Sequence, residues 1–406
     1  MDWKAMSDIY DVLIIGGGAG GLSAGVYCAR GKMNTLLLEG SAKTGGQCAK
    51  TSELENYPGI VESTGPALMD KFRQHCDKFG VQFKRGMVSG LKMTDDGFTK
   101  EVTTQDGETY LAKSVIVATG ANPRILGIKG EREFTAKGVS YCATCDAEFY
   151  EDLDIIVVGS GNTAVEESVF LTKFVNSVRM VVLHDEGTMD ADRTAQEQAY
   201  ANDKISYIWN STVEEICGDE LVNGVRIKNL KTGEITEQEC DGVFMFVGTV
   251  PNTDFLEGAV ELNRGYVKVD DKMATSMPGV FSAGDVNDKW LRQVVTAAGD
   301  GAIAAVAAER YIAEEEHWSQ SVLEAESDRL VMFWNPLDKT SLELMTALEA
   351  LAKEKDVKLV TIDTYKSRNI ADRYEVKEIP TVIRFRDGEP QKRLDAPAAG
   401  KLESLF

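Results

Sequence analysis

Two cysteines separated by two residues, Cys142 and Cys145, are the side chains best placed by their spacing to do chemistry, and Asp146 follows them directly. A Cys-x-x-Cys pair indicates a redox-active dithiol, half of a zinc site or a chance spacing. Zinc would need a second pair of ligands at a similar spacing. The other cysteines (28, 48, 76, 217, 240) and the histidines (75, 184, 317) form no such pair, so no metal site is expected. The segments on either side of the cysteine pair must decide between these three readings.

A glycine-rich turn near the N-terminus has the pattern of a dinucleotide-binding fold. An apolar strand over 10–15 runs into Gly16-Gly-Gly18-Ala-Gly-Gly21, a helix over 22–30 and a strand over 35–38 follow, and that strand ends at Glu39. In this pattern Gly16 makes the tight turn, Gly18 lets the backbone approach a pyrophosphate, and Gly21 lets the helix pack on the strand. The pyrophosphate is expected at the helix N-terminus, and the ribose hydroxyls at Glu39.

The same pattern returns after the cysteine pair. A strand over 154–158 leads into Gly159-Ser-Gly161-Asn162-Thr163-Ala164, followed by a helix through Phe174 and a strand over 178–183. Ala164 stands where the third glycine was, which the pattern permits. Two nucleotide-binding folds around a dithiol suggest a relay of electrons from a nicotinamide to a flavin to a disulfide.

The end of the second fold's last strand indicates which nicotinamide cofactor fits. It reads His184-Asp185-Glu186, and no arginine follows until Arg193. NADP(H) needs cations for its 2′-phosphate, whereas an acid suits the free 2′-hydroxyl of NAD(H). A carboxylate within about 4 Å of a phosphate charge would cost about 4 kcal/mol at an effective dielectric of 20. If Asp185 and Glu186 are only a solvated turn, the positive cluster is still missing. NAD(H) is therefore favoured and NADP(H) disfavoured.

The bulk properties exclude several classes of function. A chain of 406 residues should hold two or three domains. The net charge of −21 argues against nucleic acid or an anionic membrane as partners. Seven cysteines in a chain of this length do not make a disulfide scaffold and fit a reducing compartment. With no apolar run of membrane-spanning length and no signal-peptide core, a cytoplasmic location is expected.

Residues 8–315 resemble the low-molecular-weight thioredoxin reductases. The resemblance rests on short motifs whose order and spacing along the chain are specific. They are Gly45-Gly46-Gln47 and Glu55-Asn56-Tyr-Pro-Gly59 as flavin-contacting loops, Val117-Ala-Thr119-Gly120 and Phe246-Val-Gly-Thr-Val-Pro-Asn252 as crossovers between domains, and Gly284-Asp285-Val286 with Arg292-Gln293-Val294 at the flavin ribityl chain and ring.

The resemblance implies an α/β fold with two Rossmann-like dinucleotide-binding domains, the second inserted in the first. The FAD-binding domain would comprise residues 1–121 and 252–315, and the pyridine-nucleotide domain with the dithiol residues 122–251. A domain rotation about hinges near Gly120 and Gly248 would let the disulfide and the nicotinamide take turns at the flavin. The expected FAD contacts are Gly16, Gly18, Gly21, Glu39, Gly46, Gln47, Asn56, Thr119, Gly120, Gly284, Asp285, Arg292, Gln293 and Val294; those expected for the nicotinamide cofactor are Gly159, Gly161, Asn162, Thr163, Ala164 and Asp185.

The resemblance also implies the catalytic roles. Cys145 resembles the thiol that accepts electrons from the flavin, Cys142 the interchange thiol that attacks the substrate disulfide, and Asp146 the acid that protonates a leaving thiolate. The expected substrate is a thioredoxin-like or peroxiredoxin-type protein, and a homodimer is implied. Two alternatives remain open: the same thiol chemistry driven by reduced ferredoxin or another flavoprotein, and a low-turnover regulatory protein that keeps FAD.

The C-terminal part adds a third domain. The run 314–328 reads as a helix end and polar linker, with the linker at 316–327. Residues 328–406 resemble thioredoxin, with Pro380 as the expected cis-proline. Counted from Trp334, the two cysteine positions of that fold fall on Asp338 and Ser341, and its buried acid is Met332. No cysteine lies beyond Cys240. A thioredoxin-like domain without redox chemistry is expected.

Overall fold

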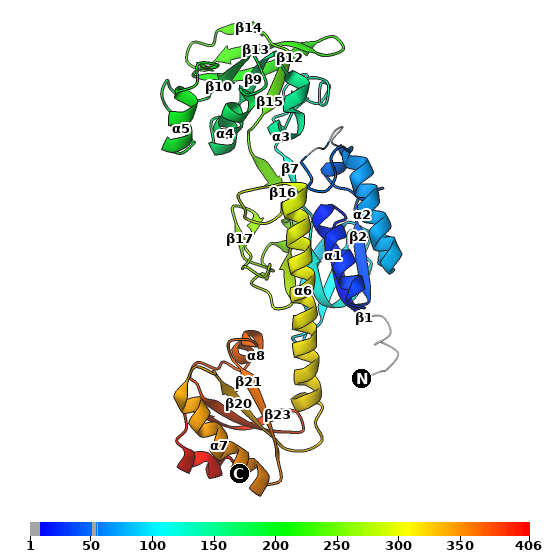
Figure 1. The fold of residues 1–406 in the computed structure, drawn as a ribbon, viewed down its shortest axis with the longest axis vertical. Helices are drawn as coiled ribbons and strands as arrows, with labels where there is room; N and C mark the ends of the chain where they lie inside the picture. Colours follow the sequence, from blue (N-terminus) through cyan, green and yellow to red (C-terminus); the bar gives the residue numbers. More distant parts are fainter. Residues whose placement is uncertain (1–8, 51–53, 55) are drawn as a thin grey trace.

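The computed structural model describes residues 9–50, 54 and 56–406. Three α/β bodies follow one another along the long axis of the molecule, with the second domain at one end, the first in the middle and the thioredoxin-like domain at the other end (Figure 1). In the described part of the chain, no helix is long and apolar enough to cross a bilayer.

The first domain is built on a seven-stranded sheet of order β3-β2-β1-β6-β5-β4, with β19 pairing with β6. The pairs β1–β2, β1–β6 and β6–β19 are parallel, so the carboxyl ends of these strands lie at the same edge of the sheet. The apolar run Val12–Ile15 is buried on both faces, as expected for a central parallel strand. The elements are β1 (Ile9–Ile15), α1 (Ala19–Arg30), β2 (Thr35–Glu39), α2 (Gly65–Phe79), β3 (Gln82–Arg85), β4 (Val88–Met93), β5 (Lys100–Thr104), β6 (Thr109–Val117), β17 (Leu262–Asn263), β18 (Tyr266–Val267), β19 (Val280–Ser282) and α6 (Val294–Trp318).

The second domain is inserted between two short strands of the chain. These strands, β7 (Ala121–Pro123) and β16 (Thr249–Pro251), pair antiparallel and carry the chain between the domains. The inserted domain has a five-stranded sheet of order β11-β10-β9-β15-β8 and a three-stranded sheet β12-β13-β14. Its elements are β8 (Val139–Ser140), α3 (Ala143–Asp146), β9 (Asp154–Val158), α4 (Asn162–Leu171), β10 (Ser177–Val181), α5 (Arg193–Tyr200), β11 (Ile205–Ile208), β12 (Ser211–Gly218), β13 (Val222–Asn229), β14 (Ile235–Glu239) and β15 (Gly242–Met245).

The third domain is a four-stranded sheet of order β21-β20-β22-β23 with two helices. The expected cis peptide bond is confirmed at Ile379–Pro380. The strand β23 was not predicted from the sequence, because most of its residues are polar and all but Leu394 are exposed. The elements are β20 (Arg329–Trp334), α7 (Lys339–Glu354), β21 (Lys358–Asp363), α8 (Arg368–Arg373), β22 (Thr381–Arg386) and β23 (Glu389–Asp395).

The junction before the third domain differs from the polar linker expected over 316–327. The helix α6 continues to Trp318, and a π-helical turn covers Ser319–Leu323. Trp318 and Val322 are buried in the core of the third domain, where the Trp318 ring lies 5.6 Å from Phe385 between centroids. The surrounding charged residues favoured the prediction of a linker. Trp318 and Val322, however, are apolar and four residues apart, so they share one helix face. The third domain is therefore seated on the end of α6.

Candidate functional site

A cavity of about 1590 Å³ lies between the first and second domains. It is lined by most of the residues expected to contact FAD, and by both cysteines of the pair: Gly16, Gly18, Glu39, Gly46, Gln47, Thr119, Gly120, Gly284, Asp285, Arg292, Gln293, Val294, Cys142, Cys145 and Asp146. Gly21 and Asn56 do not line it, and Glu55 lies outside the described residues. The sequence motifs of both domains thus converge on one space.

The glycine-rich turn of the first domain forms one wall of this cavity. Gly16 has a φ of +104°, and a Cβ there would lie 2.4 Å from the Ala118 carbonyl oxygen. A Cβ on Gly21 would lie 1.9 Å from the Gly16 carbonyl oxygen, so Gly21 serves the packing of α1 on the turn. Gly18 is the N-cap of α1, and nothing lies within 4 Å of its Cβ position. The open helix N-terminus can receive a phosphate.

Glu39 holds the shape of this wall. One carboxylate oxygen accepts a hydrogen bond from the Gly17 amide at 2.8 Å, and the other from the Ser41 amide at 2.7 Å. Each oxygen keeps a lone pair for a further donor, because a carboxylate offers about four acceptor sites. The carboxylate at the end of β2 can therefore accept ribose hydroxyls as well as fix the turn.

Asp285 gives the test of whether a flavin cofactor fits. Its Oδ1 atom is buried and has no hydrogen-bond partner among the described residues. Burial raises the pKa of this carboxyl, with Lys289 and Arg292 acting in the opposite direction. Buried carboxylate oxygens without partners are costly and rare, so this atom calls for a hydroxyl donor supplied by a ligand. The ribityl hydroxyls of FAD meet that requirement, and the residues present fit the cofactor.

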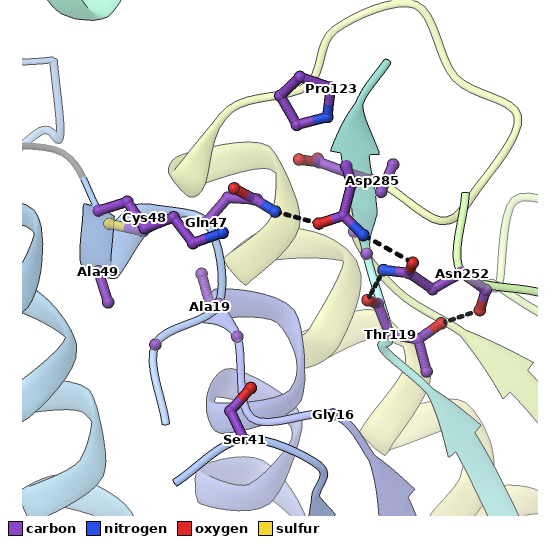
Figure 2. A pocket seen from close by; sticks show the side chains of 18 of the residues that line it. Gly16, Ala19, Ser41, Gln47, Cys48, Ala49, Thr119, Pro123, Asn252 and Asp285 are labelled. Carbon is purple, nitrogen blue, oxygen red and sulfur yellow. Dashed lines mark hydrogen bonds between the residues drawn. The ribbon is translucent and has the colours of Figure 1, made fainter. Parts of the chain in front are cut away.

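The two chain crossovers are tied together beside the cavity (Figure 2). Thr119 Oγ1 donates to the Asn252 carbonyl oxygen at 2.8 Å, and Asn252 Nδ2 donates to the Thr119 carbonyl oxygen at 2.9 Å. Asn122 Nδ2 donates to Asn252 Oδ1 at 2.8 Å, and Gln47 donates to Asn122 Oδ1. Asn122 was not singled out in the sequence, although it follows the predicted crossover motif by two residues. This network joins the loop that carries Gln47, which was expected to contact the flavin, to both connecting segments.

The cysteine pair is a disulfide in this structure, with the two Cα atoms 5.3 Å apart. Cys142 is the N-cap of α3 and Cys145 lies within that helix. Among residues 9–50, 54 and 56–406, no three metal-ligating side chains gather into a cluster. The pair can therefore be written as a dithiol–disulfide couple.

Asp146 lies next to the disulfide and faces the same cavity. Burial raises the pKa of its carboxyl, whereas a hydrogen bond from Ser140 Oγ to Asp146 Oδ2 at 2.6 Å acts to lower it. Ser140 Oγ also accepts a bond from the Cys142 amide at 3.1 Å. A carboxyl that keeps its proton to higher pH than usual is suited to donating one.

The second glycine-rich turn lies apart from this cavity. Gly159 has a φ of +134°, Gly161 is the N-cap of α4 with nothing within 4 Å of its Cβ position, and Ala164 is buried against the turn. Thr163 lies in the first turn of α4 and is exposed. The side chain of Asn162 is held by Asp192, the N-cap of α5, through bonds of 2.6 and 2.8 Å. The helix α4 therefore presents a second open N-terminus.

The rim beside this second turn is acidic. Asp185 is exposed and forms an ion pair with Lys231. Asp190, which the sequence reading did not single out, accepts hydrogen bonds from Ser160 at 2.8 Å and pairs with His184 at 2.9 Å, and these bonds lower the pKa of its carboxyl. Arg193 is exposed and paired with Glu197. Lys231, the cation beside Asp185, is engaged in its ion pair with that carboxylate.

The third domain carries no dithiol at its former redox positions. Asp338 is the N-cap of α7, and its carboxylate accepts bonds from the Ser341 amide and hydroxyl, both at 2.7 Å. These bonds lower the pKa of the Asp338 carboxyl, so it serves as an ionised helix cap. Met332 fills the buried position expected for an acid. These side chains have structural roles.

Comparison with known proteins matches both parts of the chain. The pyridine nucleotide-disulphide oxidoreductase family matches residues 10–301, and the thioredoxin family matches residues 310–405. The thioredoxin reductase of Peptoclostridium litorale is 49% identical over 317 residues, which cover 76% of this chain and 99% of that protein. The crystal structure of thioredoxin reductase from Streptococcus pyogenes has 42% identity and a TM-score of 0.70, and covers 76% of this chain and 99% of that chain.

One relative shares the whole domain series. The bifunctional thioredoxin reductase/thioredoxin of Mycobacterium leprae is 36% identical over 448 residues, which cover 99% of this chain and 96% of that protein. The alignment is longer than the 406 residues of this chain, so that relative contains residues that have no counterpart here.

Proposed function

Because the chain belongs to the pyridine nucleotide-disulphide oxidoreductase family and is an oxidoreductase of the thioredoxin reductase type, we propose that it carries electrons from NADH through FAD and the Cys142–Cys145 pair to a disulfide of a separate protein. The predicted family resemblance, the α/β fold with two Rossmann-type domains and a thioredoxin domain, and the enzyme class are confirmed. A thioredoxin is the substrate class of such enzymes, and a thioredoxin-like or peroxiredoxin-type protein is proposed here.

The observation that carries the proposal is the shared cavity. The flavin-contacting motifs of the first domain and the disulfide of the second domain line the same space. FAD, when bound, supplies two-electron transfer between a nicotinamide and a disulfide. The disulfide gains two electrons and two protons and becomes the Cys142 and Cys145 dithiol, while NADH is oxidised to NAD⁺. NADH gives up both electrons and one proton, and the second proton comes from solvent.

The dithiol then acts on the partner protein by thiol–disulfide exchange. The Cys142 thiolate attacks one sulfur of the partner disulfide, and a mixed disulfide forms as the other partner sulfur leaves. Asp146 donates a proton to that leaving sulfur. Cys145 attacks Cys142, which restores the Cys142–Cys145 disulfide and releases the second partner thiol. Two electrons leave the dithiol and two enter the partner.

The preference for NADH rests on the acidic rim of the second turn. Asp185 and Asp190 make the rim of this turn acidic, and hydrogen bonds from Ser160 and His184 lower the pKa of the Asp190 carboxyl, whereas a 2′-phosphate would need cations. Lys231 is the cation beside Asp185, but the ion pair occupies it. Ribose hydroxyls can donate to these carboxylates, whereas a phosphate would be repelled by them.

The electron acceptor is proposed to be a separate protein because the third domain cannot serve. It contains no cysteine. The 25-residue helix α6 also separates the two sites, since a helix of that length spans about 37 Å. Its first residue lines the flavin cavity and its last residue, Trp318, is buried in the third domain.

Anaerobic titration of the purified flavoprotein with NADH, NADPH and reduced ferredoxin, followed by the loss of flavin absorbance, tests the proposal. NADH is expected to bleach the flavin faster than NADPH. Bleaching by ferredoxin alone would support the ferredoxin alternative, and slow bleaching by every donor would support a low-turnover regulatory protein.

A further inference from the structure

One side-chain hydrogen bond joins the disulfide loop of the second domain to the first domain. Gln293 Nε2 donates to Thr144 Oγ1 at 3.0 Å. Thr144 lies between the two cysteines, and Gln293 is the N-cap of α6 and lines the flavin cavity. Apart from bonds made by the connecting strands and their flanks, it is the sole side-chain hydrogen bond between the two domains in the described part of the chain.

The bond belongs to a longer polar chain. On the side of the first domain, Asn56 Nδ2 donates to Gln293 Oε1 at 3.2 Å. On the side of the second domain, Thr144 Oγ1 lies 3.5 Å from Cys142 Sγ. The chain therefore runs from the flavin-contacting loop, through the end of α6, to the sulfur proposed to attack the substrate.

The two partners lie on bodies that are connected by only two chain crossings. Thr144 and Gln293 are 149 residues apart in sequence. The crossings contain Gly120 with a φ of +67° and Gly248 with a φ of +95°, and nothing lies within 4 Å of either Cβ position. Rotation about these crossings would separate Thr144 from Gln293, so their bond forms only while the disulfide faces the flavin cavity.

We propose that Thr144 and Gln293 are positioning residues that form a latch, which favours the arrangement with the disulfide at the flavin over the arrangement with the nicotinamide there. The proposal rests on the electron relay proposed above. A neutral hydrogen bond shifts such an equilibrium by about two- to tenfold, and this one is partly exposed to water, so a shift of about two- to fivefold is expected. The latch would set the balance between two rates, the reduction of the flavin by NADH and the reoxidation of the flavin by the disulfide.

The matched pair Thr144→Val and Thr144→Ser tests the latch, because valine keeps the shape of threonine without the hydroxyl and serine keeps the hydroxyl. Rapid-mixing absorbance measures two rates in the holoenzyme: reduction of the flavin by NADH, and reoxidation of photoreduced flavin by the enzyme's own disulfide. In Thr144→Val the first rate should rise and the second should fall, so that the ratio of the first rate to the second increases by about two- to fivefold. Thr144→Ser should resemble the wild type.

A second readout needs no nicotinamide. In the oxidised holoenzyme, a water-soluble phosphine should reduce the Cys142–Cys145 disulfide about two- to fivefold faster in Thr144→Val, because the disulfide spends more time away from the cavity. The latch is overturned if Thr144→Val changes neither the phosphine rate nor the reoxidation rate, or if both flavin rates fall together. Failure of NADH to reduce the wild-type flavin would instead count against the proposed electron donor. The phosphine and reoxidation rates would still test whether the Thr144–Gln293 latch exists.

Discussion

Glu315, near the end of α6, and Arg373, at the end of α8, form an ion pair between the first and third domains in which the carboxylate is buried and the guanidinium is partly exposed. Arg373 Nη2 donates to both carboxylate oxygens of Glu315, at 2.8 and 2.9 Å. The Glu315 side chain is only 3% exposed, and Asn369 Nδ2 supplies a further bond at 2.5 Å. Together with the buried Trp318, this pair fixes the third domain on the helix.

Arg373→Met should destabilise this junction strongly, because it leaves the Glu315 carboxylate buried without its cation. Breaking a buried pair in this way costs roughly 3–5 kcal/mol, measured as the free energy of unfolding of the third domain in urea. The matched control is Arg368→Met, since Arg368 is 84% exposed and lies 3.6 Å from Asp372. That exposed pair should contribute less than about 1 kcal/mol. Equal effects of the two changes would contradict the role of the junction.

The pH dependence of disulfide exchange should report on Asp146. Burial raises the pKa of its carboxyl, so the acid form persists to higher pH than usual, and exchange should slow as pH rises through that raised pKa. Asp146→Asn should slow exchange by about 10²-fold at low pH and abolish this decline. Ser140→Ala removes the bond that lowers the pKa, so the decline should move to higher pH. A decline that persists unchanged in Asp146→Asn would assign it to another group.

The cofactor preference should respond to Asp185. Asp185→Ser removes a carboxylate and frees Lys231, so the KM for NADPH should fall by about three- to tenfold. The KM for NADH should rise, because the ribose loses an acceptor. Asp219→Ser, in the turn between β12 and β13, is a matched loss of charge that should change neither value. A parallel change in both variants would point to net charge rather than to a specific contact.

A buried lysine makes stability depend on pH. Lys100 is fully buried and donates to the carbonyl oxygens of Phe98 and Lys113 and to the Tyr311 hydroxyl. Burial lowers the pKa of its amine to about 7, although Glu315 acts in the opposite direction.

Between pH 7 and about 10 the unfolded chain therefore binds a proton that the folded chain has released, and the contribution of Lys100 to stability rises with pH. The free energy of unfolding of the wild type, minus that of Lys100→Met, should grow by up to about 1.4 kcal/mol per pH unit in this window. Urea unfolding at pH 7, 8 and 9 measures the difference. A constant difference would mean that the lysine stays charged when folded.

The local patterns of the two nucleotide-binding turns could be predicted from the sequence because a single strand–turn–helix unit carries its own signal. The predicted strand over 154–158 matches β9 residue for residue, and Gly16 and Gly159 both have the positive φ that the tight turn of this pattern requires. Asp190 and Asp192 could not be predicted in this way. Their roles arise only when the loop folds back onto the turn at Ser160 and Asn162, 30 residues earlier.

At the junction between the first and third domains the prediction was wrong, because it followed the polar composition of the segment rather than the spacing of its apolar residues. The charged and polar run over 314–328 suggested a helix end and a polar linker over 316–327, yet Glu315, Trp318 and Val322 lie on one helix face and are all buried. What covers that face is a different domain, so the charges alone gave no sign of its burial. The edge strand β23 was missed for a related reason: its residues are exposed, and only pairing with β22 defines it.

Counting the electrons that the enzyme takes up tests the central claim most directly. Anaerobic titration of the wild-type flavoprotein with dithionite should consume two electron equivalents for the flavin and two more for the disulfide. The double variant Cys142→Ser/Cys145→Ser should consume only the first two, and Cys48→Ser, an unpaired cysteine that also lines the cavity, should behave as the wild type. Equal uptake by the wild type and the double variant would contradict electron flow through Cys142 and Cys145.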